Sequence, residues 1–586
     1  MSSPVYSKEQ DSQIKQSSSQ LETQISTVKT PTSEENNQGW FTTFKEGFKP
    51  IKLDNVDPNM TELEKANFIA SSTPAERAMK PRHLRMIAMG SCIGTGLFIG
   101  TGTSLRTGGP AGLLIAFTVV GIQIFCVVQG LAEMAVAFPT SGSFVQYATR
   151  FVSGPFGFAT AWVYTINWAL VMPLELVAAS LTIKFWNTEV NSAAWVVIFY
   201  FFIMFIHLFG AKAYGEAEFW FSSIKLVTVI GFIIFGIIID CGGGPKSDGY
   251  LGGKYFRDPG AFAHGFKGVC SVLITACFSM QGTELTGLAA AETANPRKAI
   301  PSACKQVFWR ILIFYMICLT MLGLLVPFTD KKLMGSGSAD ASASPFVISI
   351  KNAGVKGLPS VVNVVIMLSV LSVGNSAVFA CSRCVASLAN QGFAPKIFDY
   401  IDQQGRPLAG YFISFFFGLL CFLAASKDEA TIFAWMMAIS GLSTLFTWSA
   451  ICLVHIRFRA ALKFQGRSTD ELVYTSQTGV LGSYLALILC VLILIAQFWI
   501  ALFPIGKSPN PTDFFQAYLT APVWLFFYFF YVLYKRDFRP WIPLKDLDID
   551  EGRREMDMDL VLQEIEEEKA YIRTKPFYYR LMKFLC

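Results

Sequence analysis

The stretch Ser91-Cys92-Ile93-Gly94-Thr95-Gly96-Leu97-Phe98-Ile99-Gly100 decides the fold of this chain. It lies inside the first long apolar segment, roughly residues 84–106. Each glycine costs a helix interior roughly 0.5–1 kcal/mol relative to alanine. Two interpretations are open. Either the glycines let a continuous helix pack closely against a neighbour, or the helix breaks over residues 93–96. In the second case the outer half-helix begins with free N–H groups and a positive dipole end, which together bind a carboxylate.

The composition indicates a polytopic membrane protein. Of the 586 residues, 53% are hydrophobic and 15% are charged, whereas soluble domains carry about 25% charged residues. The net charge of +6 needs no nucleic-acid partner to explain it. About twelve apolar segments are long enough to cross a bilayer: 84–106, 110–137, 157–183, 194–210, 218–239, 268–291, 307–327, 358–387, 409–425, 431–454, 482–503 and 516–534.

The sixth of these segments repeats the oddity of the first. It reads Phe278-Ser279-Met280-Gln281-Gly282-Thr283-Glu284-Leu285, and its Gly-Thr pair mirrors Gly94-Thr95. Two interrupted spans in corresponding halves of a chain are typical of an inverted-repeat transporter with its site at the breaks. The half-helix N-terminus at the first break, around Ile93 to Gly96, would hold a carboxylate. Unwound carbonyls near Phe278 and Gln281 would hold an ammonium group, so the predicted ligand is an α-amino acid.

The predicted spans also contain ionisable side chains, which are costly in lipid and usually functional. Lys225 is either a carrier of a coupling proton or a side chain that snorkels to the cytosolic interface. Glu284, beside the second break, favours a gating or proton role. For Glu133 and Glu175, a structural ion pair or hydrogen bond is as good an interpretation as proton coupling. Asn375 and Ser376 either line a cavity or bond neighbouring helices.

The charge pattern predicts that both termini are cytosolic. Basic residues flank the start of the first span, and twelve is an even number of crossings. We therefore expect a largely disordered cytosolic tail over 1–83, a twelve-helix transport domain over 84–534, and a cytosolic C-terminal tail over 535–586. The basic, aromatic end of the last tail resembles an anchor on membrane lipids. Cys586 is either a palmitoylation site or a free surface thiol.

Enzyme and pump readings lack their required parts. The sequence contains no His-Glu-x-x-His, no Cys/His cluster and no Walker loop, so we expect no enzyme, no metal site and no cofactor. A proton gradient could serve as the energy source through Lys225, which could take and release a coupling proton.

Several motifs occur in a fixed order along the chain. They are Arg82-His83-Leu84-Arg85-Met86-Ile87-Ala88, Ile93-Gly94-Thr95-Gly96-Leu97, Thr107-Gly108-Gly109-Pro110, Gly215-Glu216-Ala217-Glu218-Phe219, Asp258-Pro259-Gly260-Ala261-Phe262, Asn295-Pro296-Arg297-Lys298, Leu325-Val326-Pro327, Ser344-Pro345-Phe346, Leu358-Pro359-Ser360-Val361-Val362-Asn363-Val364-Val365 and His455-Ile456-Arg457-Phe458-Arg459. With them, the chain resembles the fungal amino acid permeases of the amino acid–polyamine–organocation superfamily, in particular the broad-range permeases.

The resemblance implies an all-α fold of five plus five inverted helices (LeuT-type), with broken first and sixth helices and two extra helices. It implies that Ile93, Gly94, Thr95 and Gly96, with Phe278, Ser279, Gln281 and Gly282, hold the substrate. Lys225 matches a lysine that proton-coupled relatives use in place of sodium, and Glu284 matches an acidic residue tied to the site. The final Cys586 matches a palmitoylated cysteine, and tail lysines resemble ubiquitin acceptors for a ligase that drives endocytosis.

The function expected from this resemblance is proton-coupled import of amino acids across the plasma membrane by alternating access. The protein would also pass through the endoplasmic reticulum during export and through endosome and vacuole during turnover. Two alternatives remain. A receptor of the same fold would bind amino acids and signal. A permease narrowed to basic amino acids is suggested by Gln281, which resembles the residue of basic-amino-acid permeases.

Overall fold

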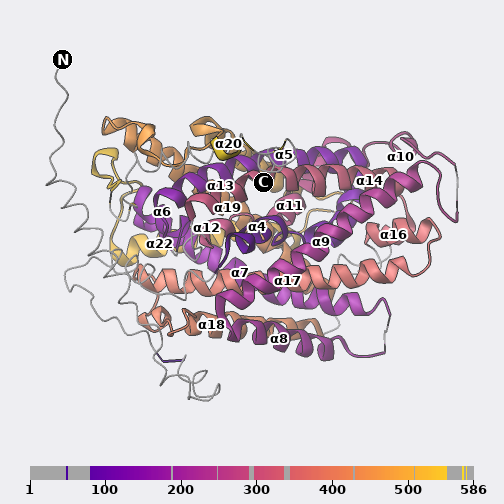
Figure 1. Cartoon of the computed structure of the whole chain (residues 1–586), viewed down its shortest axis with the longest axis horizontal. Helices are drawn as coiled ribbons and strands as arrows, with labels where there is room; N and C mark the ends of the chain where they lie inside the picture. The colour runs from indigo at the N-terminus through magenta and orange to yellow at the C-terminus, as the bar shows by residue number, and fades with distance from the viewer. Residues whose placement is uncertain are drawn as a thin grey trace. The chain divides into compact units, whose positions relative to one another are not determined.

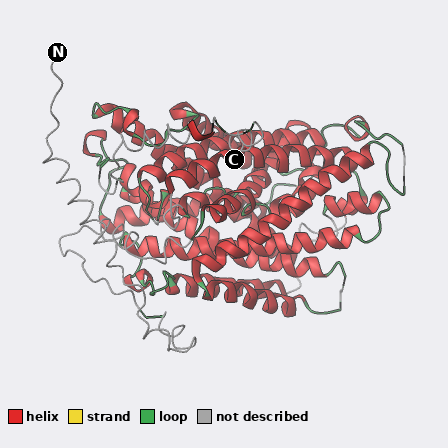
Figure 2. Cartoon of the chain, in the orientation of Figure 1, coloured by secondary structure: helices red, strands yellow, loops and turns green. Residues whose placement is uncertain are grey.

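The computed structural model describes residues 79–550 apart from 141, 187–188, 247–248, 290–295, 335–343, 426–428 and 507. It also describes Phe48, Lys49 and the isolated positions 553, 570–572, 574 and 576. Residues 1–50 form a unit of their own, and the fold below is that of the second unit, residues 51–586. Every secondary-structure element of the described residues is a helix (Figure 2).

Figure 1 labels the main helices. In chain order the elements are α4 (Pro81–Gly90), η2 (Gly96–Gly100), α5 (Thr101–Ala137), α6 (Phe144–Phe151), α7 (Gly154–Ile183), α8 (Ser192–Leu208), α9 (Gly210–Asp240), α10 (Lys254–Arg257), α11 (Gly265–Met280), α12 (Leu285–Leu288), α13 (Pro296–Arg310), η3 (Ile311–Ile317), α14 (Cys318–Leu325), α15 (Lys331–Met334), α16 (Pro345–Asn352), α17 (Leu358–Asn390), η5 (Lys396–Asp399), α18 (Leu408–Gly418), η6 (Leu419–Ala425), α19 (Glu429–Phe464), η7 (Thr469–Glu471), α20 (Gly479–Leu502), α21 (Pro511–Tyr518), α22 (Thr520–Lys535) and η8 (Leu544–Asp546).

Each of the twelve predicted spans coincides with helix in the described residues. Within the part of the chain that the structure describes, seven helical stretches are long and apolar enough to cross a membrane, and α21 and α22 meet the same test as a pair bent by 61°. Two shorter apolar helices, α8 and Leu408–Phe422, supply the fourth and ninth spans. The first and sixth spans are broken, as predicted. The inverted relation between the two halves stays a prediction.

The turn between the first two spans lies inside one long helical stretch. Gly109 takes φ 73° and ψ 173°, and Pro110 follows it. The N–H of Ala111 donates to the carbonyl of Ala261 over 2.9 Å, so the loop before α11 holds this kink. A positive φ of this kind favours glycine, because it carries no Cβ.

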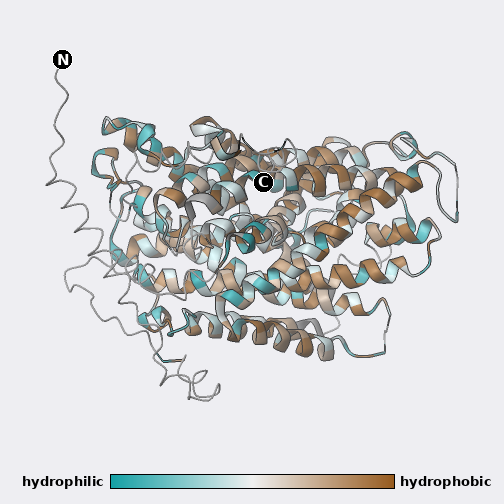
Figure 3. Ribbon diagram, in the orientation of Figure 1, coloured by the Kyte–Doolittle hydropathy of each residue, from teal (hydrophilic) through white to brown (hydrophobic). Residues whose placement is uncertain are grey.

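The buried interior of the helical unit is formed chiefly by α5, α7, α11 and α17. Figure 1 shows α7 lying along α17, and α11 packs along α5 in the same way. Figure 3 shows apolar residues along most of the long helices, with hydrophilic residues mainly at helix ends and in loops. Large apolar side chains exposed on α8, α9, α20 and α22 face outward, as expected where lipid replaces water. The chain is therefore a multi-pass membrane protein.

A C-terminal segment, residues 541–550, lies against the ends of several spans. Its Leu547 and Ile549 are 3% and 1% exposed. The N–H of Ile542 donates to the carbonyl of Val152 over 2.7 Å, and the Gln465 amide donates to the carbonyl of Leu547 over 2.8 Å. Of the membrane anchor predicted over residues 571–586, the structure describes positions 571, 572, 574 and 576, and Cys586 lies outside the described residues.

Candidate functional site

The first span breaks where the glycines cluster. Helix α4 ends at Gly90, the chain leaves helical geometry after it, and a helix resumes at Thr95. The N–H of Phe98 donates to the carbonyl of Gly94 over 3.0 Å, which is the first turn of the new helix. A helix that begins here leaves its earliest N–H groups without intrahelical acceptors. The broken-helix interpretation is thus confirmed, and the continuous-helix interpretation is wrong.

The glycines of the first break also allow neighbouring helices to pack closely against it. A Cβ built on Gly96 would lie 2.5 Å from Cα of Ser279, and one built on Gly94 would lie 2.5 Å from Cγ2 of Val373. Real Cβ atoms do not approach so closely. The glycines of the first break therefore permit contact with both α11 and α17.

The second break lies against the first. Helix α11 ends at Met280, Gln281 is extended, and Gly282 has φ +95°, a conformation that favours glycine. The Ser91 hydroxyl donates to the carbonyl of Gly282 over 3.1 Å. Two interruptions almost two hundred residues apart in the sequence are thus joined by a hydrogen bond, both in buried backbone.

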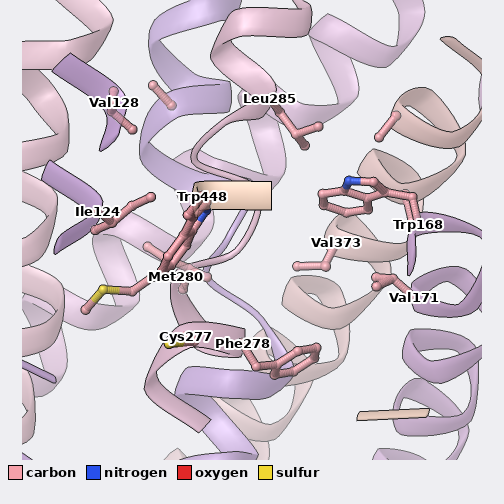
Figure 4. Close-up of a cluster of buried hydrophobic side chains, with 14 of the residues drawn as sticks. Ile124, Val128, Trp168, Val171, Cys277, Phe278, Met280, Leu285, Val373 and Trp448 are labelled. Atoms are coloured by element: carbon pink, nitrogen blue, oxygen red, sulfur yellow. The ribbon is translucent and has the colours of Figure 1, made fainter. Parts of the chain in front are cut away.

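Polar side chains near the second break keep unused hydrogen-bonding capacity. Ser440 Oγ lies 2.9 Å from Gln281 Oε1 and 2.7 Å from Asn167 Oδ1. The amide nitrogens of Gln281 and Asn167, and the indole nitrogen of Trp168, are buried and have no hydrogen-bond partner among the described residues. Figure 4 shows Trp168 and Phe278 on either side of Val373 in this region. Buried polar groups normally have partners, so these three donors are suited to a ligand.

Glu284 organises the second break. Its carboxylate accepts from the N–H of Gly282 over 3.2 Å, from the Trp448 indole over 3.3 Å and from the Tyr164 hydroxyl over 3.4 Å. The side chain is 1% exposed. These contacts place it at the start of α12, beside the break, as the sequence pattern indicated.

Lys225 contacts the first break from α9. Its Nζ donates to the carbonyl of Gly90 and to Ser372 Oγ, each over 2.8 Å, and the residue is 1% exposed. The snorkelling interpretation is therefore wrong. Glu175 reaches the same break from α7, where its carboxylate accepts from the Thr95 hydroxyl.

Three other candidates have different surroundings. Glu133 pairs with Arg459 over 2.7 Å and accepts from the N–H of Ser476 over 2.7 Å, and neither partner belongs to the breaks. Both side-chain atoms of buried Asn375 lack a partner among the described residues. Ser376 lies 3.1 Å from the Tyr214 hydroxyl, on α9. Among the described residues, none of these three side chains makes a hydrogen bond or ion pair with the residues of the breaks.

Sequence reasoning missed two buried charged residues close to the breaks. Glu218, on α9, has no exposed surface and accepts from Ser372 Oγ over 2.7 Å. Its spacing of seven residues from Lys225 puts both on one helix face, which is a readable signal. Arg310, at the end of α13, also has no exposed surface. Its signal was a lone arginine between Trp309 and Ile311 in an apolar run.

Comparison with known proteins gives consistent matches. The family model described as "Amino acid permease" matches residues 83–544. The general amino-acid permease GAP1 of Saccharomyces cerevisiae is 54% identical over 549 residues, covering 93% of this chain and 91% of the relative. The general amino-acid permease GAP2 of Candida albicans is 55% identical, with 93% of each chain covered. The S-adenosylmethionine permease GAP4 of Candida albicans is 45% identical and covers 93% of this chain and 90% of its own.

Proposed function

Because the chain belongs to the amino acid permease family, we propose that it imports amino acids across the plasma membrane as a proton-coupled symporter of broad specificity. The observation that carries this proposal is the contact between the two breaks, made by Ser91 and Gly282. A ligand bound at that contact would lie beside the start of the helix that resumes at Thr95 and the end of α11.

The chemistry of the breaks suits a zwitterion. The N–H groups at the start of the helix that resumes at Thr95, with the positive end of its dipole, attract a carboxylate. The C-terminal end of α11, at Met280, has the opposite polarity and offers carbonyl oxygens to an ammonium group. The glycines at positions 94 and 96 let α17 and α11 pack against the first break, and Gly282 supplies the positive φ of the second break.

Lys225, Glu175 and Glu284 are the candidate proton-coupling groups, because each is buried and contacts one of the breaks. Protonation of any of them changes the charge beside the ligand. A membrane potential adds about 2.3 kcal/mol per elementary charge per 100 mV, which favours inward movement of a proton with a neutral amino acid.

Broad specificity is proposed from the relatives whose names describe general permeases. Another relative is named for S-adenosylmethionine, so the substrates named for these relatives differ. Gln281 keeps the alternative of a preference for basic amino acids open to test.

Radiolabelled uptake in permease-deleted yeast tests the function. Expression of the chain should restore uptake, and competition by lysine, leucine, proline and glutamate should define the range. Lys225→Ala should abolish accumulation against a gradient at unchanged surface level. Binding without uptake by the parent chain would favour a receptor, and full accumulation by Lys225→Ala would remove Lys225 as a coupling group.

Regulation by a ubiquitin ligase, trafficking through the endoplasmic reticulum, endosome and vacuole, and palmitoylation at Cys586 are proposed on the same footing. The tail lysines before residue 48 and Cys586 lie outside the described residues. Lys→Arg replacement in the tail and Cys586→Ser, each followed by surface half-life, test them separately.

A further inference from the structure

Glu218 is a buried charged residue to which the proposed function assigns no role. It lies on α9 two helical turns before Lys225, with no exposed surface. A buried carboxylate needs paired charge and hydrogen bonds to be tolerated. Its surroundings supply both, and they connect it to Lys225 through a single hydroxyl.

The connecting hydroxyl is that of Ser372 on α17. Lys225 Nζ donates to Ser372 Oγ over 2.8 Å, and Ser372 Oγ donates to Glu218 Oε2 over 2.7 Å. The direct distance from Lys225 Nζ to Glu218 Oε1 is 3.9 Å. The two charged groups are therefore joined by a continuous chain of hydrogen bonds, the arrangement through which protons pass in membrane proteins.

The same carboxylate supports the contacts that hold α4 in place. Ser222 Oγ lies 3.2 Å from Glu218 Oε1 and donates to the carbonyl of Met86 over 3.0 Å. Lys225 donates to the carbonyl of Gly90. Ser222 and Lys225, which both lie beside Glu218, thus donate hydrogen bonds to two carbonyls in the last turns of α4. Helix α4 is the inner half of the first span.

A further pair of hydroxyls continues the chain away from Lys225. Ser376 Oγ lies 3.5 Å from Glu218 Oε2 and 3.1 Å from the Tyr214 hydroxyl. Glu218 is seven residues, about 10 Å of helix, nearer the N-terminal end of α9 than Lys225. In the predicted topology this end of α9 faces the cytosol. The chain of hydrogen bonds therefore runs from the first break toward the cytosolic side of the protein.

The other titratable groups around the pair are few in the described part of the chain. Glu175 on α7 and Cys92 in the first break lie on the Lys225 side, and Tyr214 lies on the Glu218 side. Helix α4 faces the pair with backbone carbonyls, and α17 faces it with serine hydroxyls.

We propose that Glu218 receives the coupling proton from Lys225 through the Ser372 hydroxyl, and that its neutralisation frees α4 to move. This inference rests on the proposed proton-coupled transport. The Lys225 ammonium gives one proton to Ser372 Oγ while the Ser372 hydroxyl proton passes to Glu218 Oε2. One N–H bond breaks, one O–H bond forms on the carboxylate, and a neutral amine and a carboxylic acid result.

Neutralisation weakens the attachment of α4 in two ways. Charge-assisted hydrogen bonds are roughly twice as strong as neutral ones, so Lys225 holds Gly90 less firmly once it is an amine. Ser222 and Ser372 lose an ionised acceptor at the same moment. Release of the proton through Ser376 and Tyr214 then restores the carboxylate for the next cycle.

The test uses the full chain purified into liposomes, with the amino acid that competes best in the yeast assay. Two rates are compared: accumulation driven by an imposed pH gradient, and counterflow exchange without one. Exchange moves no net proton. One pH unit corresponds to about 1.4 kcal/mol, hence about tenfold accumulation for one proton per substrate. Glu218→Gln should lose this accumulation and keep exchange, because glutamine retains the shape and an acceptor oxygen but cannot take the proton.

Glu189→Gln, an exposed carboxylate between α7 and α8, is the matched control and should accumulate like the parent. Ser372→Ala leaves both charged groups in place and should slow gradient-driven uptake by about tenfold, about 1.4 kcal/mol in barrier height, with exchange preserved. If Glu218→Gln does not fold, the Ser372→Ala variant tests the proton transfer in its place.

The outcomes separate the two proposals. A parent chain without gradient-driven accumulation contradicts proton-coupled transport itself. If the parent accumulates substrate and Glu218→Gln accumulates it equally well, the role of Glu218 is overturned. If Glu218→Gln does not fold, undiminished accumulation by Ser372→Ala overturns it instead. Equal loss of exchange and accumulation in a folded Glu218→Gln assigns the residue a structural role and also overturns it.

Discussion

Arg310 donates from Nη2 to Thr283 Oγ1 over 2.6 Å, and from Nη1 to the carbonyl of Ala88 over 2.5 Å. Thr283 belongs to the second break and Ala88 to the last turn of α4. A single buried guanidinium on α13 therefore links the two interrupted spans. Arginine suits this task because its planar fork reaches two acceptors at once, which a lysine ammonium on one flexible stem does less well.

Arg310→Ala should abolish uptake. Hydrogen bonds to charged groups contribute about 1.5–3 kcal/mol each, and both acceptors would be left buried without their partner. Arg310→Lys should keep a charge but only one of the two contacts, so its maximal uptake rate should fall by about tenfold, equivalent to about 1.4 kcal/mol. Uptake normalised to surface protein measures this. Parent-like rates in both variants would show that the link is dispensable.

Gly96→Ala should block transport by forcing the two breaks apart. The new Cβ would lie 2.5 Å from Cα of Ser279, a backbone atom that shifts less easily than the end of a flexible side chain. Overpacking of this kind costs about 1–3 kcal/mol. Gly231→Ala is the matched control, because a Cβ there meets nothing within 4 Å. Uptake rate and melting temperature are measured for both variants. Equal uptake rates and equal melting temperatures in Gly96→Ala and Gly231→Ala would contradict the prediction.

Ser440→Ala should alter which amino acids are transported. It removes the hydroxyl shared by Gln281 and Asn167 and leaves two amides free to bind a substrate side chain. A site that hydrogen-bonds a substrate group rejects analogues without that group by up to about 10⁴–10⁵-fold, because its buried polar atoms are then left unpaired. Inhibition constants of lysine, leucine and glutamate should shift relative to one another, with little change in the maximal rate. An unchanged rank order and spacing would place the substrate side chain elsewhere.

The breaks were predictable because glycines at positions 94, 96 and 282 indicate backbone conformations and close contacts that other residues do not permit. Lys225 was visible for a similar reason, since a lone charge in an apolar run stands out. Its partner Glu218 was not recognised, although its spacing from Lys225 could have been read, because Ser372, which joins the two side chains, lies about 150 residues away on α17. The role of Glu133 was equally hidden, since its ion pair with Arg459 depends on how α5 packs against α19. Sequence patterns reveal local interruptions, whereas side-chain pairs between distant helices need the fold.

Leu547→Ala should loosen the C-terminal segment over residues 541–550. Leu547 is 3% exposed, and truncation of a buried leucine costs about 2–5 kcal/mol. The segment is also held by Arg467, whose Nη1 lies 2.6 Å from Asp550 Oδ1, so we expect faster proteolytic cleavage within it while the membrane helices stay folded. Phe538→Ala removes a side chain that is 70% exposed and should leave cleavage unchanged. Limited proteolysis of the detergent-solubilised protein measures both. Identical cleavage rates in the two variants would mean that Leu547 does not anchor the segment, and that its polar contacts hold it instead.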